Sequence, residues 1–153
     1  MNTMSEMLGN QFFLARRYSD ACKVLEQEFE KNPTNLPVLK KLIICYLQTD
    51  QSEKAFQSFY SLVKQNVELI LDTDPIRDDC PCPEIIDTVS RRMKLDGEDD
   101  ELIKMGILWL YCDKDVSTKY LSKVSPENQK YNSVQEIINI INSVTTKTNQ
   151  ELL

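Results

Sequence analysis

RRYSDACKVLEQEFEKNP, residues 16–33, is the stretch that decides how the chain folds. Its apolar residues recur at helical spacing, which is typical of an amphipathic helix. The small residue Ala21 lies in the middle of the apolar face, where a larger side chain would hold a neighbouring helix away. Pro33 has no amide hydrogen and cannot continue a helix interior, so the helix should end before it. The stretch therefore predicts one member of a closely packed helical hairpin.

The surroundings of this stretch recur along the chain, and four positions match at a separation of 34 residues. The matching pairs are Leu8 with Leu42, Phe12 with Tyr46, Ala21 with Ala55, and Leu25 with Phe59. A repeat of this length accommodates a helix, a turn and an antiparallel second helix, a unit that buries its apolar face only against its neighbours. The repetition predicts an all-α array of antiparallel helical hairpins.

The order of the residues resembles the tetratricopeptide repeat family. Leu8-Gly9-x-x-Phe12 stands where the family has Leu-Gly-x-x-Tyr, Tyr18-x-x-Ala21 opens the second helix, and Pro33 closes the repeat. The second copy departs from the pattern at Ile43, which replaces the small residue, and at Val67, which replaces the closing proline. The resemblance covers residues 2–69. It implies two repeats, at about 2–35 and 36–69, in a tetratricopeptide-like α-solenoid.

The pattern is looser beyond residue 69. The stretch from residue 72 to 83 is rich in proline and aspartate and predicts an irregular connection. A helix should follow, with Pro83 at its first position and its end near Gly97. Gly106-x-x-Trp109 lies in the next apolar stretch and is similar to the family's Leu-Gly-x-x-Tyr. We therefore expect a third, degenerate repeat at 99–126.

A cap helix should close the array, since the end repeats of such proteins need a polar outer face. Ser133-Val134-Gln135-Glu136 has the spacing of a capping box and predicts a helix at 134–145. The last residues, 146–153, are expected to form a polar tail. A chain of 153 residues suits one core, so we expect residues 1–145 to form a single domain.

The composition limits the partners of the protein. The chain has 41% apolar residues and a net charge of −6, which repels nucleic-acid phosphates and anionic lipids. It shows neither a signal-peptide pattern nor an apolar stretch that would span a membrane. Five cysteines, an odd number, fit reduced thiols better than a disulfide framework. We expect a cytoplasmic protein that binds neither nucleic acid nor membranes.

Two absences argue against an enzyme. The chain has no histidine, which removes the common nucleophile–base pairs and every histidine-containing metal motif. It has only three glycines, Gly9, Gly97 and Gly106, so neither a P-loop nor a dinucleotide-binding turn can be built. We therefore expect no catalytic residues and no cofactor.

The cysteines of the irregular connection leave one chemical alternative open. Cys80 and Cys82, with Cys112 from elsewhere in the chain, offer three thiolates to zinc, and Asp78 or Asp79 offers a fourth ligand. A single C-x-C pair is a weak zinc pattern, and nearby acids raise a thiol pKa, which disfavours redox reactivity. The alternatives are a zinc or thiol site on this loop and a turn with incidental thiols.

The resemblance implies a binding groove lined by the first helix of each repeat. The residues expected to line it are Asn10, Phe13, Lys40, Lys41, Ile44, Leu47 and Gln48. A chaperone-binding clamp known in the family needs a lysine where Glu6 stands and an asparagine where Lys41 stands, and only Asn10 fits it. We expect a non-enzymatic adaptor or chaperone-like module that binds a protein or peptide. The sequence leaves open self-association and whether the carboxy-terminal helix covers the groove.

Overall fold

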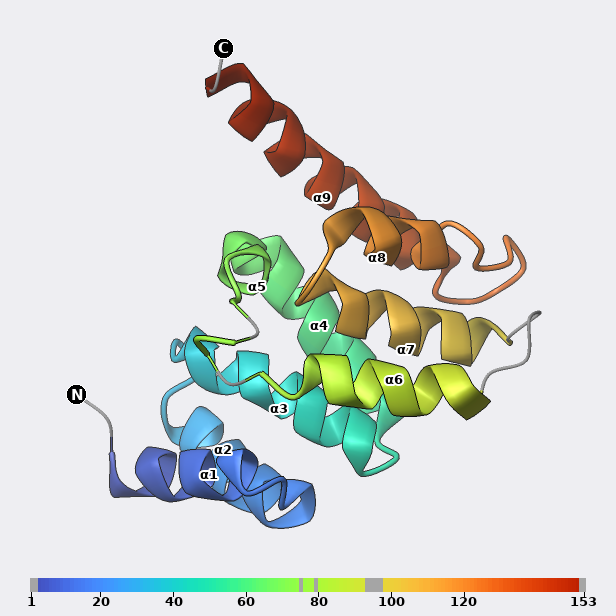
Figure 1. Ribbon diagram of the computed structural model, residues 1–153. Coiled ribbons are helices and arrows are strands. Elements are labelled where there is room, and N and C mark those ends of the chain that lie inside the picture. The colour runs from blue at the N-terminus through green and yellow to red at the C-terminus, as the bar shows by residue number, and fades with distance from the viewer. Residues whose placement is uncertain (1–2, 75, 79, 93–97, 152–153) are drawn as a thin grey trace. The chain divides into compact units, whose positions relative to one another are not determined.

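The computed structural model of the protein describes residues 3–74, 76–78, 80–92 and 98–151, with side chains up to Val144. All regular secondary structure in these residues is helical, and none of their helices is long and apolar enough to cross a membrane. The helices (Figure 1) are α1 (Met4–Leu14), α2 (Tyr18–Lys31), α3 (Leu36–Gln48), α4 (Ser52–Asn66), α5 (Glu68–Leu71), α6 (Cys82–Arg92), α7 (Asp99–Leu110), α8 (Lys114–Leu121) and α9 (Tyr131–Glu151). The all-α prediction is confirmed.

The chain divides into two compact units, residues 1–62 and 63–153, and the boundary falls within α4. Each unit is described on its own. In the first, α2 packs against both α1 and α3; in the second, α7 packs against α6 and α8, and α8 packs against α9. Helices that follow one another along the chain therefore pack as hairpins, as predicted. Their arrangement as a solenoid of tetratricopeptide repeats stays a prediction.

The helices of the first hairpin, α1 and α2, approach closely at a glycine. A Cβ atom placed on Gly9 of α1 would lie 2.7 Å from Cγ of Leu25 on α2, well inside van der Waals contact. Leu25 and Ala21, both on α2, are completely buried. The turn between the helices is tight, and Arg16 adopts a left-handed conformation (φ 62°) to make it. The two helices can approach this closely because Gly9 has no side chain.

The third helix is the most buried element of the first unit. Eight side chains of α3 between Val38 and Leu47 are buried. Asn35 occupies the N-cap position of α3, but its side chain makes no capping hydrogen bond. Tyr46 donates a hydrogen bond of 2.5 Å from its hydroxyl to Glu26 on α2. This bond ties α3 to α2 at the edge of their apolar contact.

The hairpin of α7 and α8 is also closely packed at a glycine. A Cβ atom on Gly106 of α7 would lie 2.6 Å from Cγ of Leu121 on α8. Ser117 of α8 is fully buried and donates a hydrogen bond of 2.6 Å from Oγ to the carbonyl oxygen of Gly106. Asp113 caps α8 by accepting from the backbone amides of residues 115 and 116. Close packing at a glycine thus recurs in the second unit.

Several boundaries differ from the predicted ones. Helix α6 begins at Cys82, so Pro83 lies in its first turn as expected, whereas its predicted end near Gly97 falls outside the described residues. Helix α8 ends at Leu121, before the predicted end of the repeat at residue 126. Helix α9 begins at Tyr131, so Ser133 lies inside its first turn and the capping-box prediction is wrong. Instead, the turn before α9 is held by Asn128, whose Oδ1 accepts from the amide of residue 130.

The carboxy-terminal end of the chain also differs. Helix α9 runs to Glu151, through the residues that were expected to form a polar tail. Val134, Ile137 and Ile141 are buried along one face of the helix, as the apolar spacing predicted. The helix therefore contributes to the core of the second unit with its first three turns.

We predict that Ser117→Ala destabilises the protein by about 1–3 kcal/mol, because it leaves the Gly106 carbonyl buried without its partner. The matched control is Ser122→Ala, which removes an exposed serine that also donates to a backbone carbonyl, that of Lys119. This change should cost less than about 0.5 kcal/mol. Urea unfolding followed by circular dichroism measures both. Equal midpoints for the two variants would show that the buried hydrogen bond does not hold the hairpin.

Candidate partner-binding surface

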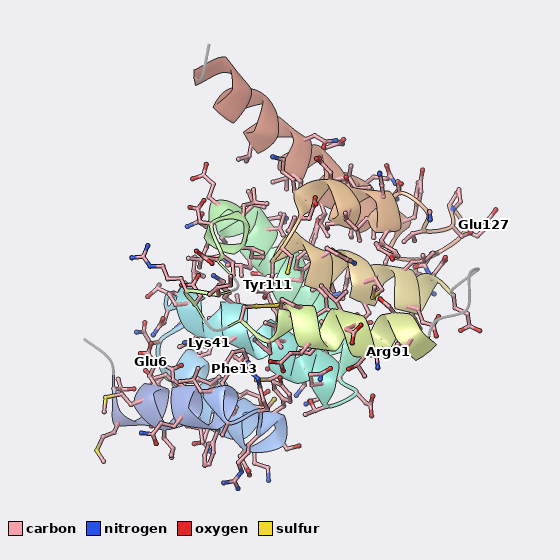
Figure 2. The ribbon with its side chains drawn as sticks, viewed as in Figure 1. Glu6, Phe13, Lys41, Arg91, Tyr111 and Glu127 are labelled. Atoms are coloured by element: carbon pink, nitrogen blue, oxygen red, sulfur yellow. A yellow bond between two sulfur atoms is a disulfide. The ribbon has the colours of Figure 1, made fainter. Side chains whose placement is uncertain are left out.

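The predicted groove residues come from two helices of the first unit. Asn10 and Phe13 lie on α1, and the other five lie on α3, which contacts α1. Two polar pairs join the helices. Nδ2 of Asn35 donates to Oε2 of Glu6 at 3.1 Å, and Nζ of Lys41 donates to Oδ1 of Asn10 at 2.8 Å. Figure 2 shows Glu6, Phe13 and Lys41 in this region. The structure therefore brings the two helices' groove residues together.

The apolar members of the predicted groove are core residues. Phe13, Ile44 and Leu47 are buried, with Ile44 only 2% exposed. Phe13 packs edge-to-face on Tyr18 of α2, with ring centroids 6.1 Å apart. An open groove would need these side chains to be accessible to a ligand. The expectation that these three side chains line an open groove is therefore wrong, because the structure buries them in the core.

The polar members remain at partly exposed positions. Asn10, Lys40, Lys41 and Gln48 are all half-buried, in contrast to the apolar members. Asn10 accepts a hydrogen bond from Lys41, and this bond positions the Lys41 ammonium beside α1. The accessible part of the predicted groove is thus a short row of amides and lysines along α1 and α3.

Glu6 stands where the chaperone-binding clamp of the tetratricopeptide family has a lysine, and it supplies the opposite charge, so we expect no such clamp. The carboxylate of Glu6 is buried and accepts a hydrogen bond from Asn35. Glu6 therefore acts within the fold, by joining α1 to the start of α3, and does not reach a ligand.

The thiols between α2 and α3 are protonated. Burial raises the pKa of the Cys45 thiol to about 12, and the neighbouring Cys22 adds to this shift. Burial also raises the pKa of Cys22. The pKa of Tyr46 is raised by burial and by its hydrogen bond to Glu26. A protonated, buried thiol is a poor nucleophile and a poor metal ligand, so these two cysteines are structural.

The loop cysteines do not assemble a zinc site. Cys80 and Cys82 are joined by a disulfide across Pro81, with their Cα atoms 5.5 Å apart. The expectation that all five cysteines are reduced is therefore wrong for this pair. Cys112 is an exposed residue with a free thiol. Partial burial of its sulfur and the charge of the neighbouring Asp113 raise the pKa of this thiol. In this structure Cys80 and Cys82 form a disulfide in place of two thiolates, and the zinc alternative stays a prediction that would need this bond to be reduced.

The aspartates of this loop are used in its own turns. Oδ1 of Asp74 accepts from the backbone amides of Ile76 and Arg77, and Oδ2 of Asp78 accepts from the amide of Asp74. Asp79, the other proposed ligand, lies outside the described residues. Within the described part of the chain, no group of three or more cysteine, aspartate or glutamate side chains could hold a metal ion.

Among its described residues, the second unit has cavities that the sequence did not indicate. One, of about 550 Å³, is lined by acidic side chains and Lys114 beside Leu71, Leu110 and Val144. Another, of about 360 Å³, lies between α6 and the end of α7 and is lined by Pro83, Ile86, Asp87, Ser90, Trp109 and Cys112. Nε1 of Trp109 is buried and finds no hydrogen-bond partner in the part of the chain that the structure describes. No spacing in the sequence marks these residues as neighbours, because they come from separate helices.

No known protein-family model matches the chain, and neither the curated proteins nor the solved structures include a significant match. The similarity to tetratricopeptide repeats therefore depends on the residues themselves.

We predict that Ile44→Asp lowers the stability of the protein by about 3–5 kcal/mol, because the carboxylate would be buried without a partner. Ile44→Val is the matched control and should cost about 0.5–1.5 kcal/mol, the usual loss for one buried methyl group. Thermal melts and urea titrations by circular dichroism measure both. An unchanged melt for Ile44→Asp would mean that the side chain faces an open groove and that the core assignment is wrong.

Proposed function

We propose that this chain is a non-enzymatic protein-interaction module, an adaptor or chaperone-like protein, that binds a peptide or a helix of a partner along α1 and α3. The observation that supports this proposal best is the pair of half-buried lysines, Lys40 and Lys41, held on α3 beside Asn10 of α1. Consecutive side chains on a helix point in different directions, so Lys40 and Lys41 offer positive charge over a broad arc of α3.

The surroundings of this row support a partner with acidic residues. The chain as a whole carries a net charge of −6, and Lys40 and Lys41 place two cationic side chains at this surface. Charges at the rim of an interface guide association and select the partner more than they add affinity. Phe13, Ile44 and Leu47 lie in the core beneath this row, and their packing holds α1 and α3 in place.

The lysines give a direct test of the proposal. The double variant K40E/K41E reverses the charge of the row, and K23E/K31E reverses two exposed lysines of α2 as a control with the same change in charge. Proteins retained from the native host's lysate by each immobilised variant are identified by mass spectrometry at low and high salt. We expect a specific protein to be retained by wild type and the K23E/K31E variant, and to be lost from K40E/K41E by at least tenfold, about 1.4 kcal/mol of binding free energy.

The salt dependence is the second readout of this experiment. Retention should fall as salt rises, because ions screen the attraction between lysines and acidic residues. Circular dichroism of K40E/K41E must show an unchanged helical spectrum, so that lost binding is not lost folding. An identical set of retained proteins for wild type and K40E/K41E would contradict the proposal that this row binds the partner.

A further inference from the structure

The disulfide between Cys80 and Cys82 spans a single residue, Pro81. A disulfide stabilises a fold mainly by restricting the unfolded chain, and this effect grows with the length of the loop that it closes. A loop closed over one residue restricts the unfolded chain far less than the long loops closed in small secreted domains. The position of this bond in the sequence therefore gives it little part in holding the fold together.

The backbone beside the disulfide is held by α6 without help from the bond. Cys82 is the first residue of α6, and the carbonyl oxygen of Pro81 accepts a hydrogen bond of 3.1 Å from the amide of Ile85. Pro81 is buried, and its ring fixes its own φ angle. The Cα atoms of Cys80 and Cys82 lie 5.5 Å apart, within the range of disulfides. These contacts keep the two thiols close after the bond is broken, so that it can form again.

The two cysteines of the pair differ in their access to solvent. Cys82 is 0% exposed, whereas Cys80 is only half-buried. The chain before Cys80 runs through exposed residues, among them Ile76 and Arg77. A thiolate opens a disulfide by attacking one of its sulfur atoms, and the sulfur that it can reach decides the site of attack. A thiol that comes from solvent therefore meets Cys80 first.

We propose that the Cys80–Cys82 pair is a reversible thiol–disulfide exchange site for a small monothiol, and that Cys80 is the residue attacked. The thiolate of the monothiol bonds to Sγ of Cys80, and the bond to Cys82 breaks. Its electron pair leaves on Sγ of Cys82, which takes up a proton. A second monothiol attacks the first one's sulfur and releases Cys80 as a thiol. The chain gains two electrons and two protons, and two monothiols become one disulfide.

The surroundings of the pair fit both sides of this exchange. The attacking thiolate belongs to the monothiol, so the acidic residues of the loop, which disfavour thiolates on the loop itself, do not prevent the first step. The negative charge that forms on Cys82 lies at the amino-terminal end of α6, where the helix dipole stabilises it. The pair lies in the second unit, and the inference does not rest on the proposed function of the lysine row in the first unit.

Counting the thiols of the wild-type protein tests whether the pair exchanges. The folded protein is equilibrated with a series of ratios of reduced to oxidised glutathione, quenched in acid, unfolded and alkylated. Mass spectrometry then counts the alkylated cysteines. We expect three of them at oxidising ratios, the number of free cysteines in the structure, and all five at reducing ratios. The same midpoint should be reached from either direction, with one helical circular-dichroism spectrum throughout.

Three results of this titration would overturn the inference. Five free thiols at every ratio would mean that the pair does not form a disulfide in the folded protein. Three at every ratio would mean that the bond is closed to exchange. Loss of the helical spectrum on reduction would mean that the bond holds the fold and is a structural disulfide.

A matched pair of variants tests which cysteine is attacked. C82S/C112S keeps the half-buried Cys80, C80S/C112S keeps the buried Cys82, and both lack the exposed thiol of Cys112. Each folded variant is mixed with oxidised glutathione, and the mixed disulfide is followed by mass on the peptide that contains residues 80–82. We expect C82S/C112S to form it roughly tenfold faster or more, because its thiol is within reach of solvent. Equal rates, or a faster reaction of C80S/C112S, would overturn the assignment of Cys80.

Discussion

The approach of two helices at a glycine is the constraint on which both described hairpins depend. At Gly9 and at Gly106, a Cβ atom would lie within 2.7 Å of Cγ of a leucine on the following helix, Leu25 or Leu121. Close packing of this kind lets a leucine of one helix fill the space above the backbone of the other. In the second unit, the buried hydroxyl of Ser117 adds a hydrogen bond to the same backbone, at the carbonyl of Gly106. Any larger residue at these glycines must displace the facing leucine side chain or move the helices apart.

The position of α1 decides what the first unit can offer a partner. With Gly9 against α2 and Glu6 and Asn10 bonded to α3, the inner side of α1 is fixed. Its outer side, with Met4, Met7, Leu8 and Leu14, is left exposed. The row with Lys40 and Lys41 and this outer side of α1 are therefore two different surfaces, one polar and one apolar. The Cys80–Cys82 disulfide and the acidic cavity belong to the second unit.

The sequence predicted the helices well where apolar spacing and a proline or glycine acted together. The helix before Pro33, the turn into α3 and the restart of a helix at Pro83 follow from local chemistry, and the structure has all three. The capping-box prediction at Ser133 failed because the residue types match the motif in sequence, whereas in the structure these residues already lie inside the helix. In the structure, Asn128 organises the turn before α9 and the helix begins at Tyr131.

The binding surface was harder to predict, because helical spacing shows which residues share a face but not what covers that face. Phe13, Ile44 and Leu47 share their faces with polar groove residues, and only the packed structure shows that they are buried. Cys112 and Trp109 line one cavity with residues of α6, a neighbourhood that no sequence separation suggests. The disulfide of Cys80 and Cys82 was missed because an odd cysteine count favoured free thiols.

A double-mutant cycle between Gly9 and Leu25 tests the central constraint most directly. The stabilities of wild type, Gly9→Ala, Leu25→Ala and the double variant are measured by urea unfolding. We predict that Gly9→Ala costs about 1–3 kcal/mol when Leu25 is present, because the added methyl group overpacks the contact. When Leu25→Ala has removed the clashing side chain, Gly9→Ala should instead stabilise by up to about 1 kcal/mol, because alanine favours a helix interior over glycine, so the two changes are coupled. An equal cost of Gly9→Ala in both backgrounds would mean that the close approach of α1 and α2 does not determine the hairpin.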